Sequence, residues 1–286
     1  MNNEEKTKKK HPVLKVVLIV LVIIVGLLGI GGVYLYGQYK EFAAQTMAAQ
    51  QGIIGTEAPD FTVTTTDGKE LTLSKVLEEK EVVVLNIFAT WCGPCKAEFP
   101  DFEKTYQKYG DKLEIISLSQ DTDDTMEDIA AYKEENGLSF PMGITGEDGT
   151  FDFVPVGGYP TTMVIDRNRK VVFCQSGTFL KKGTFEELVT SFMGDAYDGS
   201  PVFMYTLNSH TGEEFMGGVT VKLTAEDGSE TELTSEDDGL AVLKTNTGHT
   251  FKVTVVSTPD GWAVEKVSPE TVGPQSGYIT VQLKAK

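Results

Sequence analysis

A run of 21 residues without a charge, from Val16 to Tyr36, constrains the fold of this chain more than any other feature. About 20 apolar residues in a helix cross the hydrocarbon core of a bilayer. The apolar part of a cleavable secretory signal is usually shorter, about 7–15 residues. We therefore interpret residues 16–37 as a transmembrane signal anchor. Cleavage near Ala43 or Ala48 is the alternative.

The charges around this anchor indicate its direction. Residues 1–15 hold five lysines and two glutamates, a local charge of +3 in a chain of formal charge −17. Since positively charged flanks stay in the cytoplasm, residues 1–15 are predicted to be a cytoplasmic basic tail. The chain is then a single-pass protein of the cell membrane whose remaining domains are extracytoplasmic. The other 271 residues carry −20, which repels phosphate backbones and excludes a nucleic-acid partner.

Two folded regions are expected after the anchor. Residues 38–56 are polar and rich in Ala and Gln, which predicts a linker. Between residues 57 and 197, strand and helix patterns alternate, as in an α/β sheet with crossover connections. The apolar run Val82–Phe88 is typical of a central strand covered on both faces. Further elements are expected as a hairpin at 61–66 and 71–73, a short helix capped by Ser74, a helix at 93–109, a strand at 113–118, a helix at 124–135, a hairpin at 161–166 and 170–174, and a helix at 184–193.

The pattern changes near Gly199-Ser200-Pro201, after which no helical periodicity remains. Residues 200–286 contain short alternating runs separated by turn residues such as Asp227-Gly228, which predicts a small all-β sandwich. Its strands are expected at 202–207, 219–225, 231–233, 240–243, 251–256 and 278–283.

The chemistry is concentrated in the segment Cys92-Gly93-Pro94-Cys95. A buried strand ends just before it and a helix starts within it, so Cys92 is expected at the helix N-terminus. Free N–H groups and the helix dipole stabilise a thiolate there. One helical turn brings Cys95 close enough to form a disulfide with Cys92, and Pro94 suits a first helical turn. Cys92 is therefore predicted to be the attacking thiol, and Cys95 the shielded, resolving thiol.

Several motifs in order resemble the TlpA/ResA branch of the thioredoxin superfamily over about residues 57–194. They are Ala58-Pro59-Asp60-Phe61, the segment from Asn86 to Cys92, Lys96-Ala97-Glu98-Phe99-Pro100 and Gly158-Tyr159-Pro160-Thr161-Thr162. The resemblance implies a thioredoxin-like fold and a membrane-anchored, extracytoplasmic thiol-disulfide oxidoreductase without a cofactor. It also implies a membrane-embedded electron donor of the CcdA/DsbD kind. The implied substrates are disulfides or cysteines of exported proteins, among them apocytochrome c.

The resemblance also implies roles for single residues. Pro160 matches the cis-proline that packs beside the active disulfide, and Tyr159 would offer its backbone to a substrate chain. Trp91, Gly93 and Pro94 complete the implied docking surface, although the Gly-Pro pair is that of thioredoxin itself. Glu98 matches an acidic residue that is implied to tune the thiols and to move a proton near Cys95.

Other interpretations of the cysteine pair are less favoured. A zinc site needs about four ligands, but no histidine lies between His11 and His210, and Cys174 is the one other cysteine. Cys174 lies in an apolar run and is predicted to be buried and inert. A structural disulfide stays open. Peroxidase chemistry would need Thr and Pro where Ala89 and Leu85 stand. The acidic stretch 121–128 does not match a calcium loop and is interpreted as a solvated helix start.

Two alternative functions remain. The first is an oxidase that installs disulfides, although strong oxidants need a more stabilised thiolate than a thioredoxin-like Gly-Pro pair favours. The second is a surface binding protein in which the C-terminal β module carries the function. That module loosely resembles the prealbumin-like or Cna-B-type repeats of bacterial surface proteins, on the basis of segments 218–223 and 234–241.

Overall fold

The computed structural model describes residues 12–179, 184–194, 202–208, 217–236, 239–243, 250–273 and 278–286. The basic tail up to residue 11 and the predicted boundary near residues 197–200 lie outside these residues. The chain divides into two compact units, residues 1–46 and 47–286.

A single helix, α1 (Pro12–Ile53), contains the apolar run and most of the segment predicted as a linker. No helix among the described residues is both long enough and apolar enough to cross a membrane. The side chains of residues 12–28 are not among those described. The anchor at residues 16–37 therefore stays a prediction.

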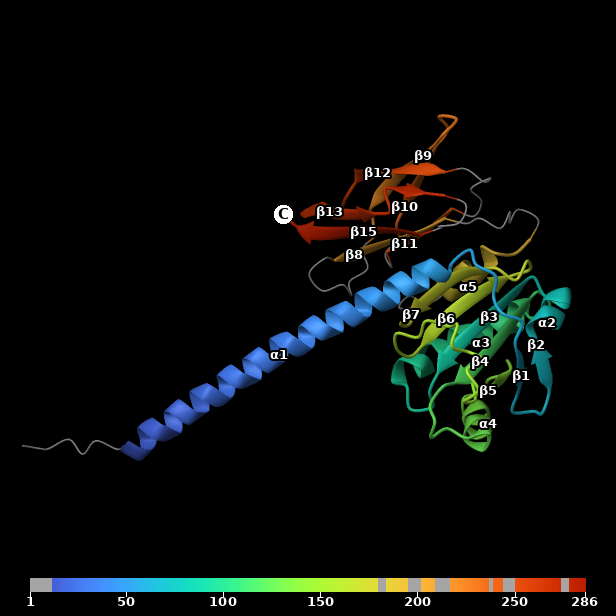
Figure 1. Ribbon diagram of the computed structural model, residues 1–286. Coiled ribbons are helices and arrows are strands. Elements are labelled where there is room, and N and C mark those ends of the chain that lie inside the picture. The colour runs from blue at the N-terminus through green and yellow to red at the C-terminus, as the bar shows by residue number, and fades with distance from the viewer. Residues whose placement is uncertain are drawn as a thin grey trace, which may run out of the picture. The chain divides into compact units, whose positions relative to one another are not determined.

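The α/β region is built on one five-stranded sheet with the order β5-β4-β3-β6-β7 (Figure 1). β3 (Val82–Phe88), β4 (Leu113–Ser119) and β5 (Met142–Ile144) are parallel. β6 (Thr161–Asp166) and β7 (Val171–Ser176) form the predicted hairpin, and β6 is antiparallel to β3. A separate hairpin of β1 (Thr62–Thr64) and β2 (Glu70–Thr72) precedes the sheet.

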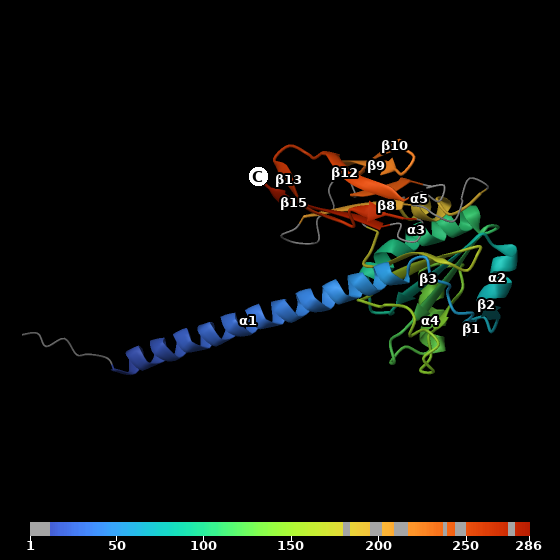
Figure 2. The same ribbon diagram turned by 45° about the horizontal axis from the view of Figure 1, so that its top comes forward.

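Side chains of β3 alternate between two cores because successive strand residues point to opposite faces. Val82, Val84 and Phe88 belong to the core under α3 (Gly93–Tyr109), α4 (Met126–Glu135) and α5 (Thr184–Thr190). Val83, Leu85 and Ile87 belong to the core on the other face, with α2 (Leu73–Glu79) and the β1-β2 hairpin. The helices α3 and α5 lie side by side (Figure 2). The stacked rings of Phe102 and Phe185 join them, with ring centroids 3.8 Å apart. The central strand is therefore covered on both faces, as predicted.

Two predicted helix starts are wrong. The cap of α2 is Thr72, and Ser74 instead donates from its N–H and its hydroxyl to Asp60. Helix α4 begins at Met126 and not at Asp124, because Thr125 forms a capping box with Asp128. At α4 the Thr125 side chain accepts a free N–H group of the first turn, whereas at α2 Thr72 makes no side-chain cap bond and Asp60 accepts the Ser74 N–H.

The C-terminal region consists of two four-stranded sheets with the orders β10-β9-β12-β14 and β11-β8-β15-β13. Both sheets contribute side chains to one hydrophobic core, for example Val221 from one and Val281 from the other. The strands are β8 (Val202–Asn208), β9 (Thr220–Ala225), β10 (Glu230–Thr234), β11 (Leu240–Leu243), β12 (Phe251–Ser257), β13 (Trp262–Ser268), β14 (Thr271–Val272) and β15 (Tyr278–Ala285).

Candidate active site

The turn between β3 and α3 positions the cysteine pair. β3 ends at Phe88 and α3 begins at Gly93, with Cys92 as the N-cap residue and Pro94 in the first turn. The Cys92 and Cys95 sulfurs form a disulfide of 2.08 Å, with the two Cα atoms 5.3 Å apart. The Cys92 sulfur also accepts the backbone N–H of Cys95 at 3.1 Å. A helix N-terminus that donates to this sulfur favours its thiolate once the pair is reduced.

The disulfide is buried beneath an exposed aromatic residue. Cys92 is 2% exposed and Cys95 is fully buried, so their exposures differ less than the sequence predicts. Trp91 is 69% exposed and donates its indole N–H to the Asp121 carboxylate.

The loop that ends at Pro160 contacts Trp91. The Tyr159-Pro160 peptide bond is cis, as the sequence predicts. The Tyr159 ring contacts the Trp91 ring edge to face, with centroids 5.9 Å apart. Tyr159 also packs against the core cluster that contains both cysteines. The structure therefore brings together the residues before the first cysteine and those before the cis-proline, which are far apart in sequence.

Glu98 is a buried acid on the same helix, one turn beyond Cys95. It is 4% exposed, and its Oε1 atom accepts the Asn86 side-chain amide at 3.3 Å. The backbone of Phe179 donates a further hydrogen bond, whereas Oε2 has no hydrogen-bond partner among the described residues. Burial outweighs these hydrogen bonds and raises the pKa of Glu98 to about 8. The acid is therefore protonated at neutral pH, and its pKa lies near that of an ordinary thiol, about 8.5.

Asn86 connects Glu98 to the neighbouring strands β4 and β6. The sequence predicts no role for Asn86 beyond its place in a family motif. Its side-chain amide also donates to Thr162 at 3.1 Å, and its carbonyl accepts the Ser117 hydroxyl at 3.3 Å. All three residues are fully buried. The sequence does contain a signal for this role of Asn86. It is a polar residue inside the apolar run Val82–Phe88, and buried polar groups are nearly always hydrogen-bonded.

Asp124 is a second functional residue that the sequence did not reveal. Its carboxylate accepts the Thr90 N–H at 3.0 Å, the Thr90 hydroxyl at 2.5 Å and the Ser119 hydroxyl at 2.5 Å. It thereby ties the segment before Cys92 to the end of β4. The sequence predicts a solvated helix start for the acidic stretch, which fits the exposed Glu127 and Asp128 in the first turn of α4 but not the half-buried Asp124.

Among the described residues, the third cysteine and the other acids form no further metal or catalytic centre. Cys174 is 2% exposed, and burial raises the pKa of its thiol to about 12, in agreement with the predicted inert role. Within the part of the chain that the structure describes, no three His, Cys, Asp or Glu side chains gather as metal ligands.

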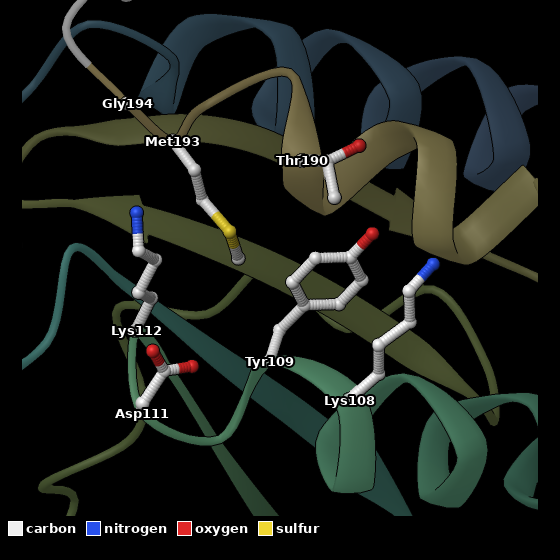
Figure 3. Close-up of a pocket in the computed structure, with 7 residues that line it drawn as sticks. All are labelled: Lys108, Tyr109, Asp111, Lys112, Thr190, Met193 and Gly194. Carbon is white, nitrogen blue, oxygen red and sulfur yellow. The ribbon is translucent and has the colours of Figure 1, made fainter.

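A shallow pocket of about 420 Å³ lies at the ends of α3 and α5 (Figure 3). It is lined by Lys108, Tyr109, Asp111, Lys112, Thr190, Met193 and Gly194. Its two cations are already paired, Lys108 with Glu186 at 2.5 Å and Lys112 with Glu81 at 3.1 Å. Neither cysteine nor Glu98 lines it, so the pocket is separate from the disulfide.

Comparison with known proteins agrees with this site. Residues 54–174 match the AhpC/TSA family. The thiol-disulfide oxidoreductase ResA of Bacillus anthracis is 38% identical over 147 residues, which cover 51% of this chain and 81% of that protein. The thioredoxin-like protein YneN of Bacillus subtilis is 31% identical over 163 residues, covering 57% of this chain and 91% of that protein. A crystal structure of a thiol:disulfide interchange protein from Chlorobium tepidum has a TM-score of 0.42 and 26% identity, and covers 49% of this chain and 97% of its own.

The thioredoxin-like sheet and a cysteine pair at the N-terminus of α3 define a thiol-disulfide oxidoreductase. With this degree of identity over most of the ResA chain, the protein belongs to the ResA-like family of these enzymes. The C-terminal β region lies beyond the residues that match the AhpC/TSA family.

Proposed function

We propose that this protein is a membrane-anchored reductase that acts on disulfides of exported proteins outside the cytoplasm. The observation that carries the proposal is the Cys92 sulfur at the N-terminus of α3, where it accepts the Cys95 N–H. This position favours a thiolate that attacks. The name of the ResA relatives supports the reaction class, and the uncharged run at residues 16–36 supports the anchor.

The reduction proceeds in two exchanges. The Cys92 thiolate attacks one sulfur of the substrate disulfide, forms a mixed disulfide and releases the other substrate sulfur, which takes up a proton. The Cys95 thiol then loses its proton, and its sulfur attacks the Cys92 sulfur. This step releases the second substrate sulfur and leaves the Cys92–Cys95 disulfide. Two electrons have then passed to the substrate.

In this scheme the ionised form of Glu98, which is the minor form at neutral pH because its pKa is about 8, receives the proton of Cys95. Cys95 and Glu98 are three residues apart on α3, so their side chains lie on one face of the helix. Proton transfer is most effective between groups of similar pKa, and the pKa of about 8 for Glu98 meets this condition. Trp91, Tyr159 and Pro160, together with Gly93 and Pro94, form the surface on which the substrate chain docks.

The oxidised pair must be reduced again for the next cycle. Glutathione does not set the redox poise outside the cytoplasm. We therefore propose a membrane-embedded dithiol donor of the CcdA/DsbD type. Apocytochrome c and other exported proteins with oxidised cysteines are the proposed substrates.

The equilibrium reduction potential of the Cys92–Cys95 pair tests the direction of electron flow. It is measured in the fragment 41–286 by titration against a thiol buffer. We expect a value near or below about −270 mV, the potential of thioredoxin. A value near about −120 mV would make the protein an oxidase instead, and the absence of a two-electron transition would overturn the redox function.

A trapping experiment tests the roles of the two cysteines. The Cys95→Ser variant should accumulate a mixed disulfide with a disulfide-containing protein, because the resolving thiol is missing. The Cys92→Ser variant should trap nothing. The opposite pattern would exchange the two roles.

We propose that the C-terminal β region is a spacer or a docking surface of the prealbumin or Cna-B kind. Its core contains no residue of the cysteine site. If Cys92→Ser had no effect in cells while removal of residues 200–286 abolished function, the β region would carry the function.

A further inference from the structure

The last turn of α1 contributes one buried polar side chain to the α/β region. Gln50 is 7% exposed, whereas its helix neighbours Ala48 and Ala49 are exposed. Its side-chain nitrogen donates to the Pro155 carbonyl at 2.9 Å and to the Ser176 hydroxyl at 2.7 Å. Both hydrogens of the amide are thus used, and the carbonyl acceptor fixes which end of the amide is the nitrogen.

The direction of the next hydrogen bonds follows from the donors and acceptors. A serine hydroxyl has two acceptor positions and one proton. The Ser176 oxygen accepts from Gln50 and from the Gly157 N–H at 3.0 Å, so its own proton points to the Thr161 hydroxyl at 2.7 Å. Thr161 in turn donates to the Gly158 carbonyl at 2.7 Å. A directed chain of hydrogen bonds therefore runs from Gln50 to the loop before the cis-proline.

These hydrogen bonds hold the loop 155–160 at three backbone groups. They are the Pro155 carbonyl, the Gly157 N–H and the Gly158 carbonyl, all within the six residues that end at Pro160. Tyr159 lies between these groups and Pro160 and contacts Trp91. Loss of Gln50 would remove the donor to the Pro155 carbonyl and one of the two donors to Ser176, so the loop would be free to take other conformations.

We propose that Gln50 is a positioning residue for substrate docking, which presets the loop 155–160 against Trp91 and the disulfide. The inference rests on the proposed docking function of Tyr159 and Pro160. The end of the segment that was predicted as a linker is therefore part of the catalytic unit, although it lies 42 residues before Cys92 in the sequence.

The test measures steady-state reduction of insulin by the full chain in detergent micelles, with the Gln50→Ala and Gln50→Met variants. Methionine keeps the length of the side chain without its donors. Both variants should raise KM for insulin at least fivefold and leave kcat within twofold. The rate at which iodoacetamide alkylates Cys92 in the reduced protein should stay within twofold, because a small reagent does not dock on the loop.

Matched variants separate positioning from general damage. Gln38→Ala removes an exposed glutamine of the same helix and should behave as wild type. Ser176→Ala should raise KM as much as Gln50→Ala does. The double variant should have no higher KM than either single variant, since both substitutions interrupt the same series of hydrogen bonds. An unchanged KM in both Gln50 variants, an equal loss of alkylation rate or an additive double variant would overturn the proposal.

The failure of this inference can be told apart from failure of the proposed function. If wild type did not reduce insulin at all, the reductase proposal would fail. The positioning role is then tested by amide hydrogen exchange at Gly157, whose N–H donates to Ser176. Exchange should be at least tenfold faster in Gln50→Ala, and equal rates would overturn the role.

Discussion

At the scale of single residues, burial rather than a neighbouring charge sets the chemistry of the site. Glu98 accepts hydrogen bonds from the Asn86 amide and the Phe179 backbone, and desolvation is the largest cause of its raised pKa. A buried acid of this kind is neutral in the folded protein over a pH range in which it is ionised in the unfolded chain. It can therefore accept a proton only after it has lost its own, which ties the resolving step to pH.

The raised pKa predicts how Glu98 changes stability with pH. Between pH 4.5 and about 8 the folded state holds a proton that the unfolded state has released, so this group lowers stability as pH rises. Glu98→Gln removes this dependence. We expect the variant to gain on the order of a few kcal/mol relative to wild type between pH 5 and pH 8. Urea unfolding at both pH values measures this difference.

The exposed control Glu135→Gln should keep the pH dependence of wild type. A parallel pH dependence in Glu98→Gln and wild type would show that Glu98 is already ionised at neutral pH. Proton transfer from Cys95 would then need another acceptor.

Residues with a role in the chemistry could be predicted because their position in the chain defines their environment. Cys92 follows a buried strand and precedes a helix, and Pro160 stands in a family motif, so both were found from the sequence. Gln50, Asn86 and Asp124 each bind at least one partner that is distant in sequence, namely Ser176, Thr162 and Thr90. Such partners depend on the packing of the sheet, and no local pattern indicates them.

At the scale of elements, one carboxylate joins the ends of two parallel strands beside the disulfide. Asp124 accepts from Thr90, which follows β3, and from Ser119, the last residue of β4. We expect Asp124→Ala to destabilise the protein by about 2–3 kcal/mol, because three donors lose a charged acceptor. It should also slow insulin reduction, since Thr90 leads directly to Trp91 and Cys92.

Asp123→Ala is the matched control, because this exposed aspartate lies next to Asp124. Its effect on stability should be within about 0.5 kcal/mol. Thermal unfolding and the insulin assay measure both variants. Equal behaviour of the two would mean that the acidic stretch is only a solvated helix start.

Helices and strands in which apolar residues recur regularly could be predicted from the sequence, and elements without such regularity could not. β3 and α3 match their predicted ranges, because a continuous apolar run and a helix start are strong signals. β13 was missed because a bulge between Val264 and Lys266 shifts the alternation of apolar residues. β5 has three residues and β14 has two, which is too short for a period to appear.

At the scale of the whole molecule, the two ends of α1 differ in their charge and apolar content. Its first part carries the uncharged run at residues 16–36, and its last turn carries Gln50, which binds the loop before the cis-proline. The proposed reductase would take its electrons from a donor in the membrane and pass them to substrates outside. The helix that carries the uncharged run also carries Gln50, a residue of the catalytic unit.

This arrangement predicts where each end of the chain is accessible. In a Cys92→Ser/Cys95→Ser background, a membrane-impermeant maleimide applied to intact cells should label Asp123→Cys, which is exposed in the folded protein. It should label Asn3→Cys only after the membrane is permeabilised, because the lysines near that end are predicted to keep it in the cytoplasm. Cys174 is buried and should contribute no background. Labelling of Asn3→Cys in intact cells, or release of the protein from membranes by carbonate, would contradict the anchor and remove the reason for a membrane-embedded donor.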